Sequence, residues 1–299
     1  MTTTCITLTG DRPVAFGLCQ KWMAAQTIKC DQWVVVEDGK VPMREPFTPL
    51  VTHIRREPQK NDPAVTMLLN LKEALKVVTG DYILVWEDDE YYHPTYIEEM
   101  VKRLKSHEAV GIGNSKYYHL AGGYRIHNNM THASLAQTAF RKELIPALQS
   151  VFSGDNFIDI RFWKKVNGFI FDDGEDNPLY VGIKGLPGRS GIGMGHAIDS
   201  YYDQDKNHAI LKKWIPKDYQ VYLDILKTVP AVEFNRERSV VGTYIAKSRG
   251  YIQGQGLIEA GQEFNYDGPR GSWMTPLELT NRYKKEVTAQ RPSLKAARS

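Results

Sequence analysis

The sequence predicts an α/β fold in which a mixed sheet is flanked by helices and followed by a small β-rich appendage. The first observation is an alternation of short apolar runs with amphipathic stretches, as in strands joined by helices. These segments are 5–9, 14–26, 31–36, 62–78 and 82–86. The second observation is a change after residue 229, where short alternating segments are separated by glycines. We therefore expect an α/β domain over 1–229 and a β-rich appendage with a basic tail over 230–299.

Composition supports a folded chain and excludes few partners. The chain has 299 residues, of which 42% are hydrophobic and 24% charged, and these values are typical of a globular protein. A net charge of +3 is too small to demand a nucleic-acid partner or to exclude one. No apolar run approaches the roughly 20 residues of a membrane span. Three loosely spaced cysteines and no signal-peptide pattern predict free thiols in the cytoplasm.

The first elements are clear in order. Residues 5–9 (CITLT) read as a strand, a turn follows, and residues 14–26 form an amphipathic helix. Residues 31–36 (DQWVVV) read as the next strand, and 51–55 as an edge strand. We expect Arg55 and Arg56, at the end of that strand, to form an exposed basic edge.

The most informative stretch is 80–98, GDYILVWEDDEYYHPTYIE. Its apolar run is typical of a buried strand, and a helix follows from 95 to 104. The four acids after the strand are Glu87, Asp88, Asp89 and Glu90. The carboxyl end of a strand is the functional end of an open α/β sheet, and clustered acids there are costly without a compensating cation. A divalent ion shared with substrate phosphates would compensate them, whereas the alternative is a solvated turn before the helix.

This register resembles the D-x-D metal motif of nucleotide-sugar glycosyltransferases of the GT-A fold, more narrowly the family 2-like members. Glu87 stands at the first acid and Asp89 at the second, and glutamate at the first place departs from the pattern. The resemblance implies a Rossmann-like mixed sheet, a nucleoside-diphosphate sugar donor and transfer to an acceptor hydroxyl. It also implies that Glu87 and Asp89 hold Mn²⁺ or Mg²⁺ while Asp88 contacts the donor.

The same resemblance assigns the ends of the first two strands to the nucleotide. Thr9 and Asp11 match the loop that meets the nucleotide, and Asp38 matches the acid that bonds the base or ribose. A carboxylate can accept hydrogen bonds from an imide N–H or a ribose hydroxyl, so the chemistry suits that place. The alternative for Asp38 is a plain turn with the following glycine.

A glycine-rich stretch, 179–196, is the second candidate for donor binding. It carries six glycines with Lys184, Arg189 and Ser190 among them, and His196 at its end. Glycines let backbone N–H groups approach an anion, and cationic side chains suit a diphosphate, so we expect a phosphate-contacting loop. The alternative is a lid without a ligand. The family resemblance implies that His196 completes the metal site, which favours Mn²⁺ over Mg²⁺.

Two acids are candidates for the general base. Inverting members of the family carry an acid on a helix near the acceptor, and the segment 153–163 (SGDNFIDIRFW) offers Asp155 and Asp159. A base must lie within hydrogen-bond reach of the acceptor hydroxyl. The alternative for Asp155 is an N-cap, and the alternative for Asp159 is a helical charge pair. Of the two we favour Asp159 as the base.

The acceptor is the least determined part. The segment 282–299 holds six Lys or Arg residues and one Glu, which fits a solvated tail or an arm that touches a polyanion. The second reading leaves room for a phage-type enzyme that glycosylates hydroxymethylated pyrimidines in DNA. Two other classes stay open: a non-catalytic binding or attachment module, and a nucleotidyltransferase. The loop 9–13 is short for the glycine-rich loop of the latter.

Overall fold

The chain divides into two units, which are described separately. The first consists of Met1–Ile198 and Tyr202–Glu233, and the second of Asp199–Tyr201 and Phe234–Ser299. The computed structural model describes residues 1–43, 50–63, 65–127, 129–152, 157–189, 196, 202–228, 242–252, 255–266 and 274–277.

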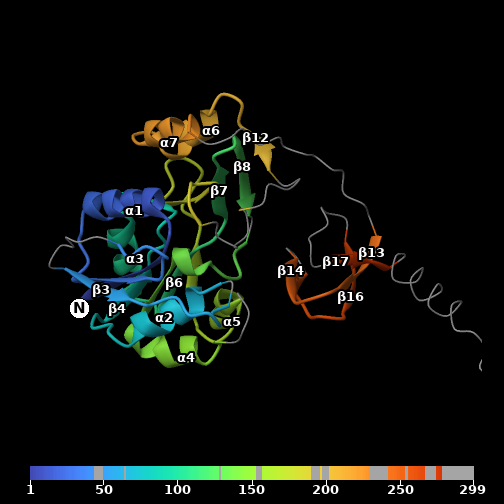
Figure 1. Cartoon of the computed structure of the whole chain (residues 1–299), viewed down its shortest axis with the longest axis horizontal. Coiled ribbons are helices and arrows are strands. Elements are labelled where there is room, and N and C mark those ends of the chain that lie inside the picture. Colours follow the sequence, from blue (N-terminus) through green and yellow to red (C-terminus); the bar gives the residue numbers. More distant parts are fainter. Residues whose placement is uncertain are drawn as a thin grey trace, which may run out of the picture. The chain divides into compact units, whose positions relative to one another are not determined.

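A seven-stranded mixed sheet forms the centre of the first unit (Figure 1). Its strands are β1 (Thr3–Thr9), β2 (Gln32–Glu37), β3 (Val51–Arg55), β4 (Tyr82–Val85), β6 (Ala109–Ile112), β9 (Thr138–Arg141) and β10 (Phe169–Phe171). They lie in the order β10-β6-β9-β4-β1-β2-β3. β1 runs parallel to β2 and β4, and β2 parallel to β3, whereas β9 is antiparallel to both of its neighbours. The carboxyl ends of β1, β2 and β4 therefore lie at one edge.

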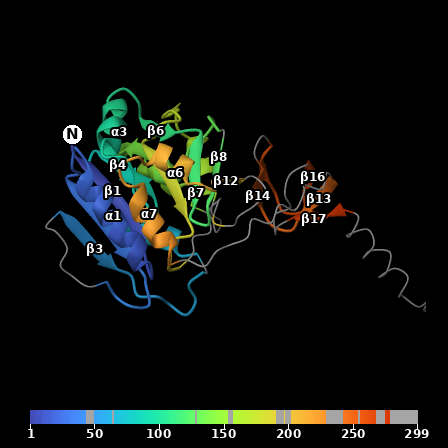
Figure 2. The same ribbon diagram turned by 90° about the horizontal axis from the view of Figure 1, so that it is seen from above.

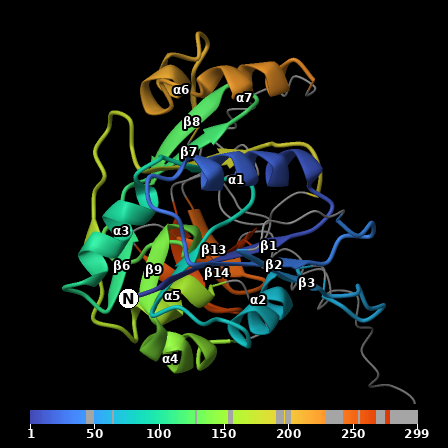
Figure 3. The ribbon, with the colours of Figure 1, turned by 90° about the vertical axis from the view of Figure 1, so that its left-hand side faces the viewer.

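Helices cover both faces of this sheet, which confirms the α/β prediction. They are α1 (Pro13–Ala25), α2 (Met67–Leu75), α3 (Tyr96–Leu104), α4 (Ile145–Gln149) and α5 (Ile158–Trp163), with the short 3₁₀ helices η1 (Leu135–Gln137) and η2 (Lys142–Leu144). α1 and α3 lie on one face and α2, α4 and α5 on the other (Figure 3). Successive strand side chains alternate between faces, so Cys5 joins the core of Trp22 while Ile6 joins that of Leu71.

A second sheet completes the first unit. Its strands are β5 (Tyr91–Tyr92), β7 (Ser115–His119), β8 (Gly123–His127), β11 (Tyr180–Lys184) and β12 (Asp203–Gln204), in the order β12-β8-β7-β11-β5. Two more helices, α6 (Ala209–Trp214) and α7 (Tyr219–Leu226), lie on the α1 side of the molecule (Figure 2). The rings of Trp22 and Tyr222, 6.2 Å apart, join α1 to α7.

The expectation of one long glycine-rich loop over 179–196 is wrong at its beginning. Residues Tyr180–Lys184 form β11, and all five are buried. Gly182 permits this strand because a Cβ there would lie 2.4 Å from the ring of Tyr117 on the neighbouring β7. The glycine therefore serves close packing between strands and not approach to an anion.

The second unit is rich in strands, as predicted. Its strands are β13 (Gly242–Ala246), β14 (Gly250–Ile252), β15 (Gly256–Ile258), β16 (Glu263–Tyr266) and β17 (Met274–Pro276). They form a three-stranded sheet, β16-β13-β17, and a two-stranded one, β14-β15. Tyr244, Ile252 and Phe264 are among the buried residues of its small core. In neither unit do the described residues include a helix that is both long and apolar enough to cross a membrane.

Candidate functional site

The carboxyl ends of β1 and β4 meet through a buried hydrogen bond. Thr9 is the last residue of β1, and its hydroxyl donates to Asp88 Oδ2 over 2.6 Å. Asp88 belongs to the turn after β4 and is 1% exposed. Burial raises the pKa of Asp88 to about 6, although Arg12 opposes the shift. Two residues assigned to the donor by sequence thus lie together because their parallel strands are neighbours.

Arg12, which the sequence did not single out, joins both aspartates of the acidic turn. Its Nη1 donates to Asp88 Oδ1 over 2.6 Å and its Nη2 to Asp89 Oδ2 over 2.8 Å. Its Nε donates to the carbonyl of Arg189 over 2.6 Å. Burial acts against the charge, but Asp88 and Asp89 outweigh it and raise the pKa of Arg12. The guanidinium is a fixed positive charge at the centre of the site.

Glu90 and Lys184 form a second, deeper ion pair. Lys184 Nζ donates to Glu90 Oε1 over 2.5 Å, and the backbone N–H of Ile183 donates to Oε2 over 2.7 Å. The side chains are 5% and 1% exposed for Lys184 and Glu90. Burial raises the pKa of Glu90 to about 7, and Lys184 moderates the shift. Lys184 therefore stands on β11 with its ammonium on a carboxylate, and not on a loop open to a diphosphate.

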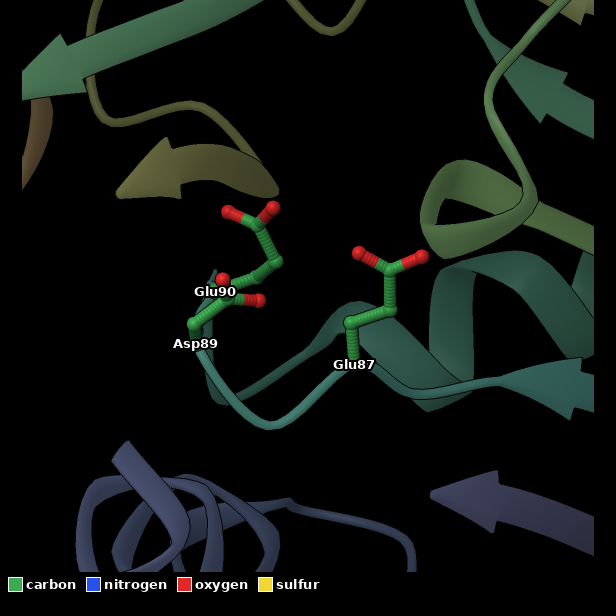
Figure 4. A group of neighbouring side chains, drawn as sticks. All are labelled: Glu87, Asp89 and Glu90. Carbon is green, nitrogen blue, oxygen red and sulfur yellow. The ribbon is translucent and has the colours of Figure 1, made fainter. Parts of the chain in front are cut away.

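Three carboxylates could hold a metal ion. Glu87, Asp89 and Glu90 each offer an oxygen, and these oxygens lie within 4.8 Å of one another (Figure 4). Within the described part of the chain, the carboxylate of Glu87 accepts no hydrogen bond and makes no ion pair. Burial, followed by the charges of Asp89 and Glu90, raises the pKa of Glu87 to about 8.

His196, the third metal ligand expected from the sequence, lies next to this cluster. Its Nε2 is 3.9 Å from Asp89 Oδ2. Burial, with the charge of Lys184, lowers the pKa of His196 to about 3, so the imidazole is neutral, the form that binds metals. Burial opposes the charge of Asp89, yet Lys184 and Arg12 hold its pKa below the ordinary value. Four acids face two cations here, so a divalent ion fits both the donor set and the charge.

A pocket opens at this cluster. Its lining residues are Arg12, Ala15, Asp89, Gly185, Leu186, Pro187 and His196. One carboxylate, one imidazole and one guanidinium therefore reach the same open space, which suits an anion bound together with a cation.

Asp38 is the centre of a separate network at the end of β2. Arg56 Nη2 donates to its Oδ2 over 2.8 Å, and Arg189 Nη2 to its Oδ1 over 2.6 Å. Burial alone would raise the pKa of Asp38, but hydrogen bonds from Thr66, Arg56 and Arg189 lower it below the ordinary value. The exposed basic edge expected at Arg55 and Arg56 is wrong: Arg55 pairs with buried Glu37, and Arg56 pairs with Asp38.

Asp11 stabilises the loop after β1 through hydrogen bonds to the backbone. Its Oδ1 accepts the backbone N–H of Lys40 over 2.8 Å, and its carbonyl accepts the N–H of Arg189 over 3.1 Å. Its φ of 54° lies in the left-handed region, where aspartate is tolerated because of such local hydrogen bonds. The hydrogen bond between Asp11 and Arg189 thus joins the glycine-rich segment, at Arg189, to the loop after β1.

Of the two candidate general bases, the structure describes Asp159 and not Asp155. Asp159 lies in the first turn of α5, and its Oδ1 accepts the N–H of Ile160 over 2.8 Å. Burial raises the pKa of Asp159 to about 6. Among the residues that the structure describes, Asp159 makes no hydrogen bond or ion pair with the acidic turn. Asp155 and Ser190 lie outside the described residues.

Comparison with known proteins gives one family. Residues 31–173 match the model described as glycosyl transferase family 2. No curated protein sequence matches the chain significantly.

Solved structures give weaker likenesses. S. aureus TarS in complex with UDP-GlcNAc is 15% identical, with a TM-score of 0.47 over 67% of this chain and 62% of TarS. The mannosyltransferase PcManGT from Pyrobaculum calidifontis, in complex with GDP-Man and Mn²⁺, is 15% identical, with a TM-score of 0.42 over 62% of this chain and 57% of PcManGT. The match thus spans less than two thirds of either protein.

Proposed function

We propose, from the match of residues 31–173 to the family 2 glycosyltransferase model, that the chain moves a sugar from a nucleoside-diphosphate sugar to an acceptor hydroxyl with the help of a divalent cation. The observation that carries this proposal is the acidic turn after β4. There, the carboxylate oxygens of Glu87, Asp89 and Glu90 converge beside a pocket that Arg12 and His196 also line.

Glu87, Asp89 and His196 are the proposed holders of the cation. Bound there, Mn²⁺ or Mg²⁺ would offset the negative charge that grows on the leaving diphosphate. Lys184 serves this arrangement by neutralising Glu90. The carboxylate of Glu87, which has no hydrogen-bond or ion-pair partner among the described residues, remains for the ion. The glutamate at the first position of the motif is thus compatible with ion binding.

The nucleoside is proposed to lie at the ends of β1 and β2. Thr9, Asp11 and Asp38 are the proposed contacts from the two strand ends, and Arg189 and Ser190 are the proposed contacts from the glycine-rich segment. Both carboxylate oxygens of Asp38 accept from arginines, so a base or ribose bound there would share Asp38 with Arg56 and Arg189. Arg189, whose side chain is 40% exposed, would have to release Asp38 to turn toward a diphosphate.

Asp159, with Asp155 as the second candidate, is the proposed general base. A carboxylate with a pKa of about 6 is largely ionised at neutral pH and still basic enough to take a proton from the acceptor hydroxyl. For the acceptor we retain the hydroxymethylated pyrimidine of DNA, as in phage-type enzymes, on the strength of the basic segment 282–299. DNA binding that weakens steeply with salt supports this acceptor, and no binding at low salt contradicts it.

Thermal stability against a panel of nucleoside diphosphates and their sugars, each with and without Mn²⁺, tests the donor site. A ligand at 100 times its Kd stabilises the folded state by about 2.7 kcal/mol. This corresponds to a rise of several degrees for a domain of this size. We expect a rise for one nucleotide that requires Mn²⁺ and is lost in Asp89→Asn.

The matched control is Asp224→Asn, which removes an exposed carboxylate of α7 that pairs with Lys227. This variant should keep the full response. No rise with any nucleotide, in a folded protein, contradicts the proposed function and favours a non-catalytic module.

A further inference from the structure

Arg12 occupies the carboxylate oxygens that a cation would use. Its guanidinium donates hydrogen bonds to Asp88 Oδ1 and Asp89 Oδ2. Asp89 Oδ2 is also the oxygen that lies 3.9 Å from His196 Nε2. The other oxygen of Asp88 accepts the hydroxyl of Thr9. Both carboxylate oxygens of Asp88 and one of Asp89 thus accept hydrogen bonds from side chains of the protein itself.

The backbone of Arg12 is held at the start of α1, and its side chain reaches the pocket. Its carbonyl accepts the N–H of Phe16 over 2.9 Å, the first hydrogen bond of α1, and Pro13 follows it directly. The side chain is 15% exposed and lines the pocket shared by Asp89 and His196. Moving the guanidinium from the carboxylates to an anion in the pocket would require no change in the helix, but it would have to keep or replace the hydrogen bond from Nε to the carbonyl of Arg189.

We propose that Arg12 is a built-in counter-cation that couples the divalent ion to the diphosphate. With the pocket empty it neutralises Asp88 and Asp89 and competes with the ion. With a diphosphate in the pocket it binds the phosphate oxygens, and Asp89 becomes available to the ion. The inference rests on the proposed function, because it needs the ion and the diphosphate to share this pocket.

The coupling gives Arg12→Gln two effects of opposite sign. Loss of the competing charge should tighten Mn²⁺ binding in the absence of nucleotide by roughly tenfold, the scale of one hydrogen bond to a charged group. Loss of the anion-binding fork should weaken UDP or GDP binding at saturating Mn²⁺ by a similar factor. A purely structural role for Arg12 would weaken both or change neither.

Arg12→Lys separates charge from geometry. Lysine keeps the positive charge but lacks the planar fork that holds two oxygens at once. We expect Mn²⁺ affinity in Arg12→Lys between those of the unsubstituted chain and Arg12→Gln, with diphosphate binding weakened. Arg103→Gln is the charge-matched control, since Arg103 pairs with Glu99 on α3, and it should leave both affinities unchanged.

The experiment is a calorimetric titration of the full chain and these three variants with Mn²⁺ alone, then with UDP and GDP separately at saturating Mn²⁺. Near-ultraviolet circular dichroism verifies that each variant is folded. Tighter Mn²⁺ binding and weaker diphosphate binding in Arg12→Gln support the inference. Mn²⁺ binding that is unchanged or weaker in this variant, or diphosphate affinity equal to that of the unsubstituted chain, overturns it. The absence of Mn²⁺ binding in the unsubstituted chain overturns the proposed cation site as well.

Discussion

Replacing Lys184 by methionine should destabilise the protein, because the buried carboxylate of Glu90 loses its partner. The ion pair with Glu90 spans 2.5 Å between side chains that are 5% and 1% exposed. Removing one partner of a buried pair costs about 3–5 kcal/mol, because the remaining charge is uncompensated. Methionine has a similar length and adds no polar group, so the loss reports the charge and not a cavity.

Proton uptake by Glu90 sets the pH dependence of this loss. Burial already raises the pKa of Glu90 above that of an unfolded glutamate, and removal of Lys184, whose charge lowers it, must raise it further. The folded variant therefore holds a proton that the unfolded chain releases above its ordinary pKa of about 4.3. The stability of Lys184→Met should fall as pH rises through neutrality, so the loss is larger at pH 8 than at pH 6.

Urea denaturation at pH 6 and pH 8 measures both effects. The double variant Glu90→Gln/Lys184→Met removes both charges and keeps an acceptor for the N–H of Ile183, so it should recover most of the loss. Lys213→Met, which breaks an exposed pair with Asp176, is the control and should change stability little. A Lys184→Met protein as stable as the unsubstituted chain at both pH values would refute the reasoning.

Three further predictions follow from the same edge of the sheet. Mn²⁺ affinity should rise from pH 6 to pH 8, because Glu87, with a pKa of about 8, must lose its proton to bind the ion; a flat calorimetric series contradicts this. Gly10→Ala places a Cβ 2.4 Å from Asp38 Oδ1 and should cost about 1–3 kcal/mol in urea denaturation, whereas Gly17→Ala, whose Cβ would meet nothing within 4 Å beyond the backbone of its own helix, should not destabilise α1. Asp159→Asn should lower kcat and leave nucleotide binding intact; an unchanged rate excludes Asp159 as the base.

The sequence was sufficient to predict those parts of the site that depend on strand order. Thr9, Asp38 and Asp88 follow apolar runs, and neighbouring parallel strands bring their carboxyl ends to one edge. The acidic turn after β4 was recognisable because four consecutive acids are unusual beside a buried strand. The helices and the strand-rich second unit were likewise visible from periodicity and glycine spacing.

The pairing of the site's cations with its acids was not predictable, because the partners lie far apart in the sequence. Arg12 lies in a Gly-Asp-Arg-Pro turn, where an arginine normally points to solvent. Lys184 reaches Glu90 across 94 residues, and only because β11 pairs with β5. Gly182 in β11, together with the glycines that follow the strand in the sequence, concealed a buried strand because such spacing resembles that of a flexible loop.

The acidic segment 171–176 (FDDGED) shows the same limit at one position, since its other acids, Asp172, Glu175 and Asp176, are exposed. Asp173 has a fully buried side chain and accepts from Lys116 Nζ over 2.5 Å. Lys116 is itself buried on β7. One acid of a charge run is thus buried where a neighbouring strand supplies the opposite charge, and local sequence does not show that partner.

Anomalous diffraction from crystals grown with Mn²⁺ and the nucleotide identified by thermal stability tests the central claim most directly. The account predicts a manganese peak bonded to Asp89 in the turn after β4, with Glu87 or His196 beside it and the diphosphate in the same pocket. Nucleotide bound at this edge without manganese on the acidic turn, or manganese bound elsewhere on the chain, would contradict it.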